Sequence, residues 1–325
     1  MKKILCYLSF LILLTFFGIC AGNVPSKAST PLQKWGQLKV SGTDIVSQTG
    51  KKVQLKGVST HGIAWFPQYV NKSCFHSFRK LGANTIRLAL YSDPGAGYTE
   101  SWYKKVEEGV RYATELGMYV IIDWHILSDG NPNKYKREAL KFFTSFSKKF
   151  GTQNNILYEI CNEPNGNVTW KRDIEPYARK VITRIRKYDK KNIIIVGTPT
   201  WSQDVDVVVQ KKLKKRNIVY ALHFYAATHT DWNREKLIKA HEAGIPVLVS
   251  EFNICDASGN GKIDRASAKK WMKLLNRYRI GYIAWNISNK AETSALIKTG
   301  CSKTGAFTKN NLSKTGKWIT KCWKK

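Results

Sequence analysis

Short apolar runs alternate with longer amphipathic stretches along most of the chain. The short runs are rich in β-branched and aromatic residues and predict eight strands, at residues 53–58, 84–90, 118–124, 156–161, 192–196, 218–224, 246–250 and 282–285. Between them, apolar residues recur at helical spacing, as in Tyr103, Val106, Val110 and Ala113. A separate pattern around Gly42 predicts a β-hairpin within residues 37–55.

Each predicted strand is a nearly continuous apolar run, which is typical of parallel strands that are covered on both faces. Eight strand-then-helix units in one chain indicate an α/β fold, a single closed (β/α)₈ TIM barrel with the β-hairpin at its N-terminus. A doubly wound open sheet is the competing fold. It would be expected to have a glycine-rich phosphate loop after an early strand, and the sequence has none. Residues 29–325 are therefore expected to form one domain.

The first 28 residues have the layout of a secretory signal peptide. Lys2 and Lys3 precede an apolar run at residues 4–19, which small residues and Pro25 follow. Cleavage after Ala28 fits the small-x-small pattern, cleavage after Ala21 is the alternative, and a retained membrane anchor is a third possibility. We expect a secreted, extracellular protein with no membrane association once residues 1–28 are removed.

The composition is globular but strongly basic. Hydrophobic residues make up 43% of the 325 residues, which excludes a disordered chain, and the formal net charge is +31. Such a charge suggests nucleic acid as a partner, but lysine outnumbers arginine, the basic residues are spread along the chain, and no nucleic-acid-binding motif is present. We expect no nucleic-acid partner. A solvated lysine-rich surface, or adhesion to an acidic matrix such as pectin, explains the charge instead.

Five cysteines remain after residue 28, and none forms a C-x-x-C motif. An odd number leaves at least one thiol unpaired, and Cys161 is the candidate because it lies inside an apolar run. Cys255 and Cys301 follow the seventh and eighth strands, so they are predicted to form a disulfide in adjacent loops. Cys74 and Cys322 are expected at opposite ends of the barrel, too far apart to pair.

Polar and aromatic side chains gather where the predicted strands end, and the carboxyl ends of barrel strands are where such folds place their active sites. They are Arg87, Tyr91, Asp123, Trp124, His125, Asn162, Glu163, Trp201, His223, Tyr225, Glu251 and Trp285. Glu163 and Glu251 come from strands three apart, and two opposed carboxylates suit glycoside hydrolysis. Arg87 and Tyr225 are expected to hold one carboxylate ionised, which would raise the pKa of the other. Exposed tryptophans offer flat apolar faces to sugar rings.

Several segments together resemble glycoside hydrolase family five. Residues 156–164 (ILYEICNEP) look like the acid/base signature of that family, and residues 123–126, 197–204, 223–225 and 250–252 resemble its other blocks. Residues 256–261 and 290–292 are similar to loops of subfamily two, the secreted cellulases. The resemblance runs from about Trp35 to the C-terminus.

This resemblance implies a retaining endo-1,4-β-glucanase in which Glu163 is the acid/base and Glu251 the nucleophile. It further implies that Asn162 contacts the sugar 2-hydroxyl, that Arg87 and Tyr225 orient Glu251, and that two histidines, His125 and His223, support the site. The implied substrate-binding residues are His61, Trp65, Phe66, Tyr91, Trp201, Trp285, Lys290 and Glu292.

The sequence departs from the family pattern at a few positions. Phe252-Asn253 replaces the usual Trp-Gly after the nucleophile, and Phe66 stands where tyrosine is common. Asn289 and Ala291 stand where His and Asp are common, which bears on the distal glucose subsites.

The expectation is a monomeric enzyme that acts on β-1,4-glucan without a metal or other cofactor. A mannanase or a xylanase is the alternative within the class. A non-catalytic polysaccharide-binding barrel is the alternative outside it, against which the intact Asn162-Glu163 pair, Glu251 and Tyr225 speak.

Overall fold

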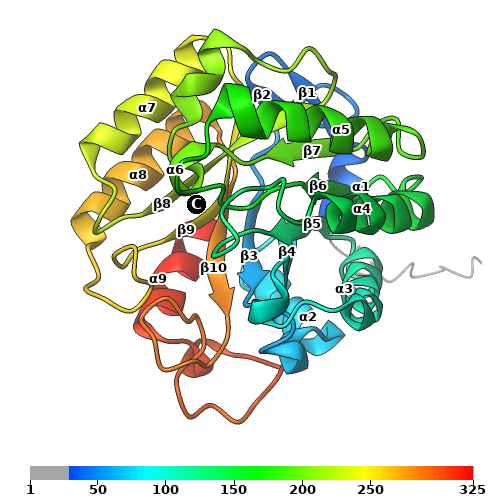
Figure 1. The fold of residues 1–325 in the computed structure, drawn as a ribbon. Helices are drawn as coiled ribbons and strands as arrows, with labels where there is room; N and C mark the ends of the chain where they lie inside the picture. The colour runs from blue at the N-terminus through cyan, green and yellow to red at the C-terminus, as the bar shows by residue number, and fades with distance from the viewer. Residues whose placement is uncertain (1–28, 325) are drawn as a thin grey trace, which may run out of the picture.

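The computed structural model describes residues 29–324 and is built around a closed barrel of parallel strands (Figure 1). The strands follow one another around the barrel in chain order, and β10 closes the ring against β3. They are β3 (Lys56–Thr60), β4 (Thr85–Tyr91), β5 (Tyr119–His125), β6 (Ile156–Glu159), β7 (Ile193–Val196), β8 (Ile218–Tyr225), β9 (Val247–Asn253) and β10 (Tyr282–Ile287). The predicted (β/α)₈ barrel is confirmed.

Helices surround the barrel (Figure 1). They are α2 (Lys72–Lys80), α3 (Tyr103–Glu115), α4 (Lys136–Phe150), α5 (Glu175–Arg186), the short α6 (Pro199–Ser202), α7 (Asp231–Glu242), α8 (Arg265–Tyr278) and α9 (Lys314–Trp323). Those from α2 to α8 lie between successive strands, while α9 follows the last strand. Apolar residues at helical spacing pack against the outward-facing side chains of the strands and form the main core. Within residues 29–324, none of the helices is long and apolar enough to cross a membrane.

The predicted N-terminal hairpin is also confirmed. A short helix α1 (Pro31–Trp35) leads into β1 (Lys39–Ser41), which pairs antiparallel with β2 (Asp44–Val46). Leu38, Ile45 and Val53 from this region pack with the lower interior of the barrel, so the hairpin closes that end. The predicted signal peptide, residues 1–28, lies outside the described residues.

Some strand boundaries differ from the prediction. The first strand was expected at 53–58 but β3 covers Lys56–Thr60, because Val53 hydrogen-bonds back to Ile45 and continues the hairpin. β6 ends at Glu159, before the apolar run does, whereas β9 and β10 continue beyond the predicted ends to Asn253 and Ile287. Apolar runs therefore locate the strands well and their ends poorly.

The alternation of side chains along each strand separates two layers inside the barrel. In β5, Tyr119 and Ile121 belong to the apolar interior, and the next inward position is Asp123, followed by His125. In β8 the same alternation passes from Val219 and Ala221 to His223 and Tyr225. The barrel is thus filled with apolar side chains below and with charged and polar ones near the carboxyl ends of its strands.

One glycine allows the chain after β6 to lie against β7. A Cβ atom on Gly197 would lie 2.0 Å from the carbonyl oxygen of Cys161 and 3.1 Å from that of Asn162. Only glycine permits this approach, which places the segment that carries Glu163 at the mouth of the barrel.

The predicted disulfide between Cys255 and Cys301 is wrong, since both thiols are free. Cys255 is buried among side chains at the barrel mouth, whereas Cys301 packs at the edge of the outer core. The reason is the path of the loop after β10. It runs to the start of α2, where Asn71 donates a hydrogen bond to the carbonyl of Thr304 (2.8 Å), and so carries Cys301 away from the loop after β9. Cys161 is a buried free thiol, as predicted.

Candidate active site

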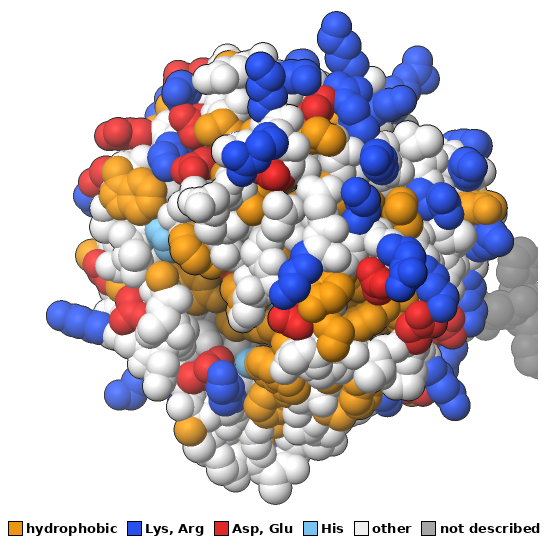
Figure 2. All heavy atoms as spheres, viewed as in Figure 1, with side chains coloured by type: hydrophobic (Ala, Val, Ile, Leu, Met, Phe, Trp, Pro, Cys, Tyr) orange, Lys and Arg blue, Asp and Glu red, His pale blue; other side chains and the backbone are white. Residues whose placement is uncertain are grey.

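The carboxyl ends of the strands surround a cleft of about 660 Å³. Figure 2 views this face and shows apolar side chains in its hollowed middle, with lysine and arginine side chains mainly toward the periphery. Of the residues predicted for the site, those that line the cleft are His61, Trp65, Tyr91, His125, Glu163, Trp201, His223, Tyr225, Glu251, Trp285, Lys290 and Glu292. The structure therefore brings most of the predicted site together.

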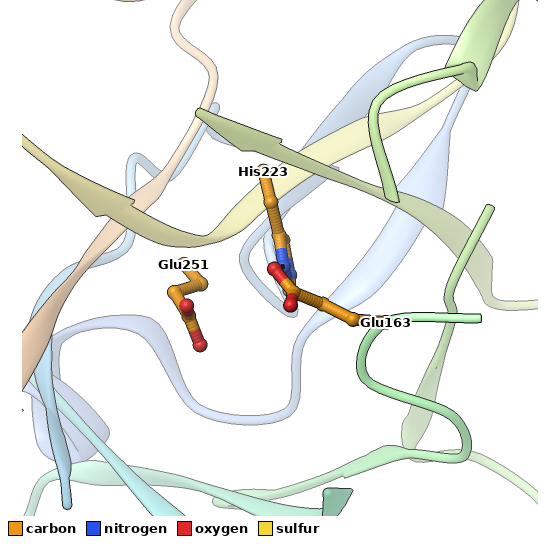
Figure 3. Close-up of side chains that lie close together, drawn as sticks. All are labelled: Glu163, His223 and Glu251. Atoms are coloured by element: carbon orange, nitrogen blue, oxygen red, sulfur yellow. Dashed lines mark hydrogen bonds and ion pairs between the residues drawn. The ribbon is translucent and has the colours of Figure 1, made fainter. Parts of the chain in front are cut away.

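The two predicted carboxylates meet in this cleft. Glu163 lies just beyond β6, and Glu251 lies on β9. Figure 3 shows that their side chains lie close together, with His223 beside them. A carboxylate oxygen of each glutamate and a ring nitrogen of His223 all lie within 4.8 Å of one another. This spacing is close to the separation of about 5–5.5 Å found in retaining glycosidases and well below the 6.5–9.5 Å of inverting ones.

His223 connects Glu163 to a buried carboxylate behind it. Its Nδ1 lies 2.9 Å from Glu163 Oε1 and its Nε2 lies 2.9 Å from Ser250 Oγ, which donates in turn to Glu159 Oε1 (2.6 Å). Burial disfavours the charged ring, but the carboxylates of Glu159 and Glu163 outweigh it and raise the pKa of His223 to about 9. His223 is therefore an imidazolium at neutral pH, with both nitrogens donating.

Glu251 is held by two donors. Tyr225 Oη donates to Glu251 Oε1 over 2.9 Å, and Arg87 Nη1 lies 3.2 Å from Oε2. Burial and the negative charge of Glu163 nevertheless raise the pKa of Glu251 to about 7, against the opposing effects of His223, Arg87 and Tyr225. One carboxylate of the pair thus has a raised pKa, as expected, but it is the one that Arg87 and Tyr225 contact, because desolvation and the second carboxylate oppose these donors.

Arg87 is a buried cation that contacts three carboxylates. It lies 3.0 Å from Asp123, 2.7 Å from Glu159 and 3.2 Å from Glu251, and its side chain has no exposed surface. Arg87 also donates to the Asn162 side-chain oxygen (2.5 Å). The guanidinium fork thus links β4, β5, β6 and β9 at one level of the barrel.

Asn162 and Arg87 lie beneath the cleft rather than on its surface. Both are fully buried, and Asn162 donates its amide to the carbonyl of Ile126 (2.9 Å). His125 lies beside them with Nδ1 2.7 Å from Asp123 Oδ2. Burial holds the pKa of His125 well below its usual range, so this ring is neutral and differs in charge from His223.

Aromatic rings form the walls of the cleft. Trp65 stacks on Tyr91 with ring centres 4.9 Å apart, and Trp285 stacks on His125 at 5.1 Å. Phe66 does not line the cleft, contrary to the prediction. Its ring packs behind His61 and against the outer core, because the chain turns inward after Trp65.

The backbone that carries Trp201 has an unusual conformation. Thr200, Trp201 and Ser202 all have φ between 54° and 57°, the left-handed region that non-glycine residues seldom adopt. Hydrogen bonds fix this turn: the Trp201 amide donates to the Pro164 carbonyl (3.0 Å) and Ser202 Oγ donates to the Asn162 carbonyl (2.6 Å). The exposed Trp201 ring is therefore positioned directly by the segment that carries Glu163.

A charged pair lines another part of the cleft. Lys290 Nζ lies 2.6 Å from Glu292 Oε2, and Glu292 Oε1 accepts from Ser294 Oγ (2.7 Å) and the Asn286 amide (3.2 Å). Although burial opposes them, these donors lower the pKa of Glu292 below its usual value. The pair presents an ordered cation and anion to the hydroxyl groups of a ligand.

Glu163, His223 and Glu251 are also spaced as a metal site would require. The contacts of His223 do not fit that role, because both of its ring nitrogens already hydrogen-bond to protein atoms, Nδ1 to Glu163 and Nε2 to Ser250. The arrangement instead suits proton transfer.

Glu159 and Ser250, which hold Arg87 and His223 from behind, could be assigned no role from the sequence. A glutamate inside an otherwise apolar strand was the available signal. Other cleft residues, from the loops and from the start of α7, were also not predicted, namely Leu127, Gln203, Thr228, His229, Trp232, Ala257, Ser258, Gly259 and Ser294.

Comparisons with known proteins agree with this geometry. The model of the family described as cellulase (glycosyl hydrolase family 5) matches residues 46–291. The chain is 42% identical to an endoglucanase of Clostridium saccharobutylicum over 98% of this chain and 72% of that protein. It is 43% identical to endoglucanase N of Pectobacterium atrosepticum over 90% of this chain and 66% of that one.

Solved structures give the same result. The cellulase Cel5C_n superposes with a TM-score of 0.88 at 37% identity, covering 92% of this chain and 95% of that one. The catalytic domain of the Thermobifida fusca endoglucanase Cel5A, in a variant bound to cellotetraose, superposes with a TM-score of 0.87 at 33% identity, covering 91% and 100%.

Proposed function

The chain belongs to the cellulase family, glycosyl hydrolase family 5, and on that basis we propose that it is a retaining endo-1,4-β-glucanase. The observation that carries the proposal is the placement of Glu163 and Glu251, with oxygens within 4.8 Å of each other in one cleft. Relatives named endoglucanase at 42–43% identity support the reaction and the substrate class.

In the first step, Glu163 donates its proton to the glycosidic oxygen while Glu251 attacks the anomeric carbon from the opposite face. The bond to the leaving chain breaks, and a covalent glycosyl ester forms on Glu251. Arg87 and Tyr225 act as positioning residues, since their hydrogen bonds fix the orientation of the Glu251 carboxylate.

In the second step, Glu163 takes a proton from a water molecule that attacks the same carbon. The ester bond breaks, Glu251 leaves as a carboxylate, and the product keeps the β configuration. His223 Nδ1, 2.9 Å from Glu163 Oε1, holds the Glu163 carboxyl group in place for both proton transfers.

The substrate would lie along the aromatic walls of the cleft. Trp65, Trp201 and Trp285 offer ring faces to the apolar faces of glucosyl units, and Lys290 with Glu292 offers polar contacts to their hydroxyls. We further propose that residues 29–325 act as one secreted catalytic domain and as a monomer, after removal of residues 1–28. In addition, we propose that the Asn162 side chain, which is buried directly beneath the cleft, contacts the 2-hydroxyl of the bound sugar.

Product analysis on carboxymethylcellulose, glucomannan and xylan tests the proposal. We expect a rapid fall in the viscosity of carboxymethylcellulose and the release of soluble oligosaccharides, as internal cleavage requires. Faster hydrolysis of xylan or of a mannan than of glucan would contradict the substrate class, and the Glu163→Gln protein serves as the inactive control.

A further inference from the structure

A third exposed tryptophan, Trp232, lines the cleft in addition to Trp65 and Trp201. It is the second residue of α7, and 43% of its surface is exposed. Among the described residues, the other large apolar side chains of similar exposure are Tyr188 and Val209, which lie outside the cleft. Exposed tryptophans therefore concentrate along this one groove, which is more than the scatter expected on a protein surface.

Trp232 is held in place by its neighbours. Its ring lies 5.6 Å from that of His229, and Lys236 Nζ lies 5.0 Å from the ring centre as a cation–π contact. Lys236 is itself fixed by an ion pair with Asp204, and Asn233 donates its amide to the carbonyl of Gln203 (3.3 Å). The ring is thus ordered before any ligand arrives, which lowers the entropic cost of binding.

These contacts also locate Trp232 relative to Glu163. The chain after α6 runs beside α7 (Figure 1), and Asp204 accepts a hydrogen bond from Thr200 Oγ1 (2.6 Å), next to Trp201. Trp201 in turn bonds to the residue that follows Glu163. Since Glu163 would protonate the leaving-group oxygen, this side of the cleft faces the leaving part of the chain.

We infer that Trp232 is an aromatic platform for a glucosyl unit of the leaving chain, further from the scissile bond than the unit at Trp201. The inference rests on the proposed glucanase function and refines it. The apolar face of a pyranose ring would stack on the indole, so the protein would favour glucans long enough to reach α7.

The test compares kcat/KM for cellohexaose with kcat/KM for an aryl β-cellobioside, whose short leaving group ends before Trp232. In Trp232→Ala the ratio of the two should fall about tenfold, which corresponds to ~1.4 kcal/mol of lost stacking. Trp232→Phe should keep most of the ratio because it retains a ring. Tyr188→Ala is the matched control, since Tyr188 is 41% exposed and also lies under a lysine, Lys148, but outside the cleft.

An unchanged ratio in Trp232→Ala would overturn the inference. So would an equal fall for both substrates, because that pattern indicates a general structural effect and not a subsite. Failure of the proposed function has a different signature, an unmodified protein that cleaves neither substrate, and it would overturn this inference as well.

Discussion

Arg87 and Glu159 form an ion pair of 2.7 Å in which neither side chain has any exposed surface. Because Arg87 also contacts two other carboxylates, this pair belongs to a buried network in which acids outnumber cations. Glu159 stays ionised there, since Arg87 and His223 outweigh its burial and lower its pKa to about 2. The network explains how a carboxylate can be kept charged in the buried layer between the apolar interior of the barrel and the cleft.

The first prediction concerns the charge of His223. Glu159→Gln removes a carboxylate whose Oε1 lies 3.6 Å from Nε2 of His223 and whose negative charge favours the protonated ring, so the pKa of His223 should fall from about 9. The ring would then lose its proton at lower pH, in a range where the unmodified protein keeps it. NMR titration of the histidine ring protons measures this midpoint, and kcat/KM should decrease in the same pH range.

Glu175→Gln is the control for that experiment. Glu175 is also a buried carboxylate paired with cations, Arg179 and Lys211, but it lies on α5 outside the barrel. The Glu175→Gln substitution should leave the titration midpoint of His223 unchanged. An unmoved midpoint in Glu159→Gln would contradict the assigned role of Glu159.

The second prediction concerns pH dependence. The first step needs Glu251 ionised and a proton on Glu163, so kcat/KM should rise with pH as this pair loses its first proton and fall as it loses its second, with burial and the charge of Glu163 raising the pKa of Glu251. Tyr225→Phe removes a hydrogen bond that stabilises the ionised form, so this rise should move about one pH unit higher. Tyr220→Phe deletes a hydroxyl from the same strand, where it accepts from the Leu213 amide, and should leave the profile in place. A shift toward lower pH in Tyr225→Phe would contradict the account.

The third prediction concerns the thiols. Cys301 is half-buried, whereas Cys74, Cys161 and Cys255 are buried and burial raises their pKa values, that of Cys255 to about 12. A thiolate-specific reagent should therefore label Cys301 in the folded protein well before these three. Peptide mapping after brief labelling checks the order, and recovery of a Cys255–Cys301 disulfide would show the loop path to be wrong.

The barrel and its two glutamates could be predicted because apolar runs mark buried parallel strands and because their carboxyl ends converge in any closed barrel. The role of Glu159 could not, since it depends on which strand residues face inward at the level of Arg87. That level is set by the register between strands, and apolar runs do not determine where strands end. β6, which is shorter than its run, illustrates this.

Loop residues were the least predictable part. Trp232 reaches the cleft only because α7 begins beside the Trp201 segment, and Phe66 misses it because of one inward turn. The wrong Cys255–Cys301 pairing has the same origin. Hydrogen bonds hold the loop after β10 against the start of α2, and the sequence gives no signal for these contacts.

The fourth prediction separates the two glutamates by product. With an activated aryl glycoside, Glu163→Ala should still form the covalent intermediate, because that leaving group needs no proton. Added azide should then intercept it and give a β-glycosyl azide. In Glu251→Ala azide should enter from the vacated side and give an α-glycosyl azide. Proton NMR of the anomeric centre distinguishes the two azides. An α-glycosyl azide from Glu163→Ala and a β-glycosyl azide from Glu251→Ala would reverse the assignment of acid/base and nucleophile.

The configuration of the first product from the unmodified protein tests the central claim most directly. Two displacements at the anomeric carbon, by Glu251 and then by water, must return the β configuration. Proton NMR during cellohexaose hydrolysis should therefore show the β anomer of the new reducing end first, with the α anomer growing only as mutarotation proceeds. An initial excess of the α anomer would contradict the retaining mechanism.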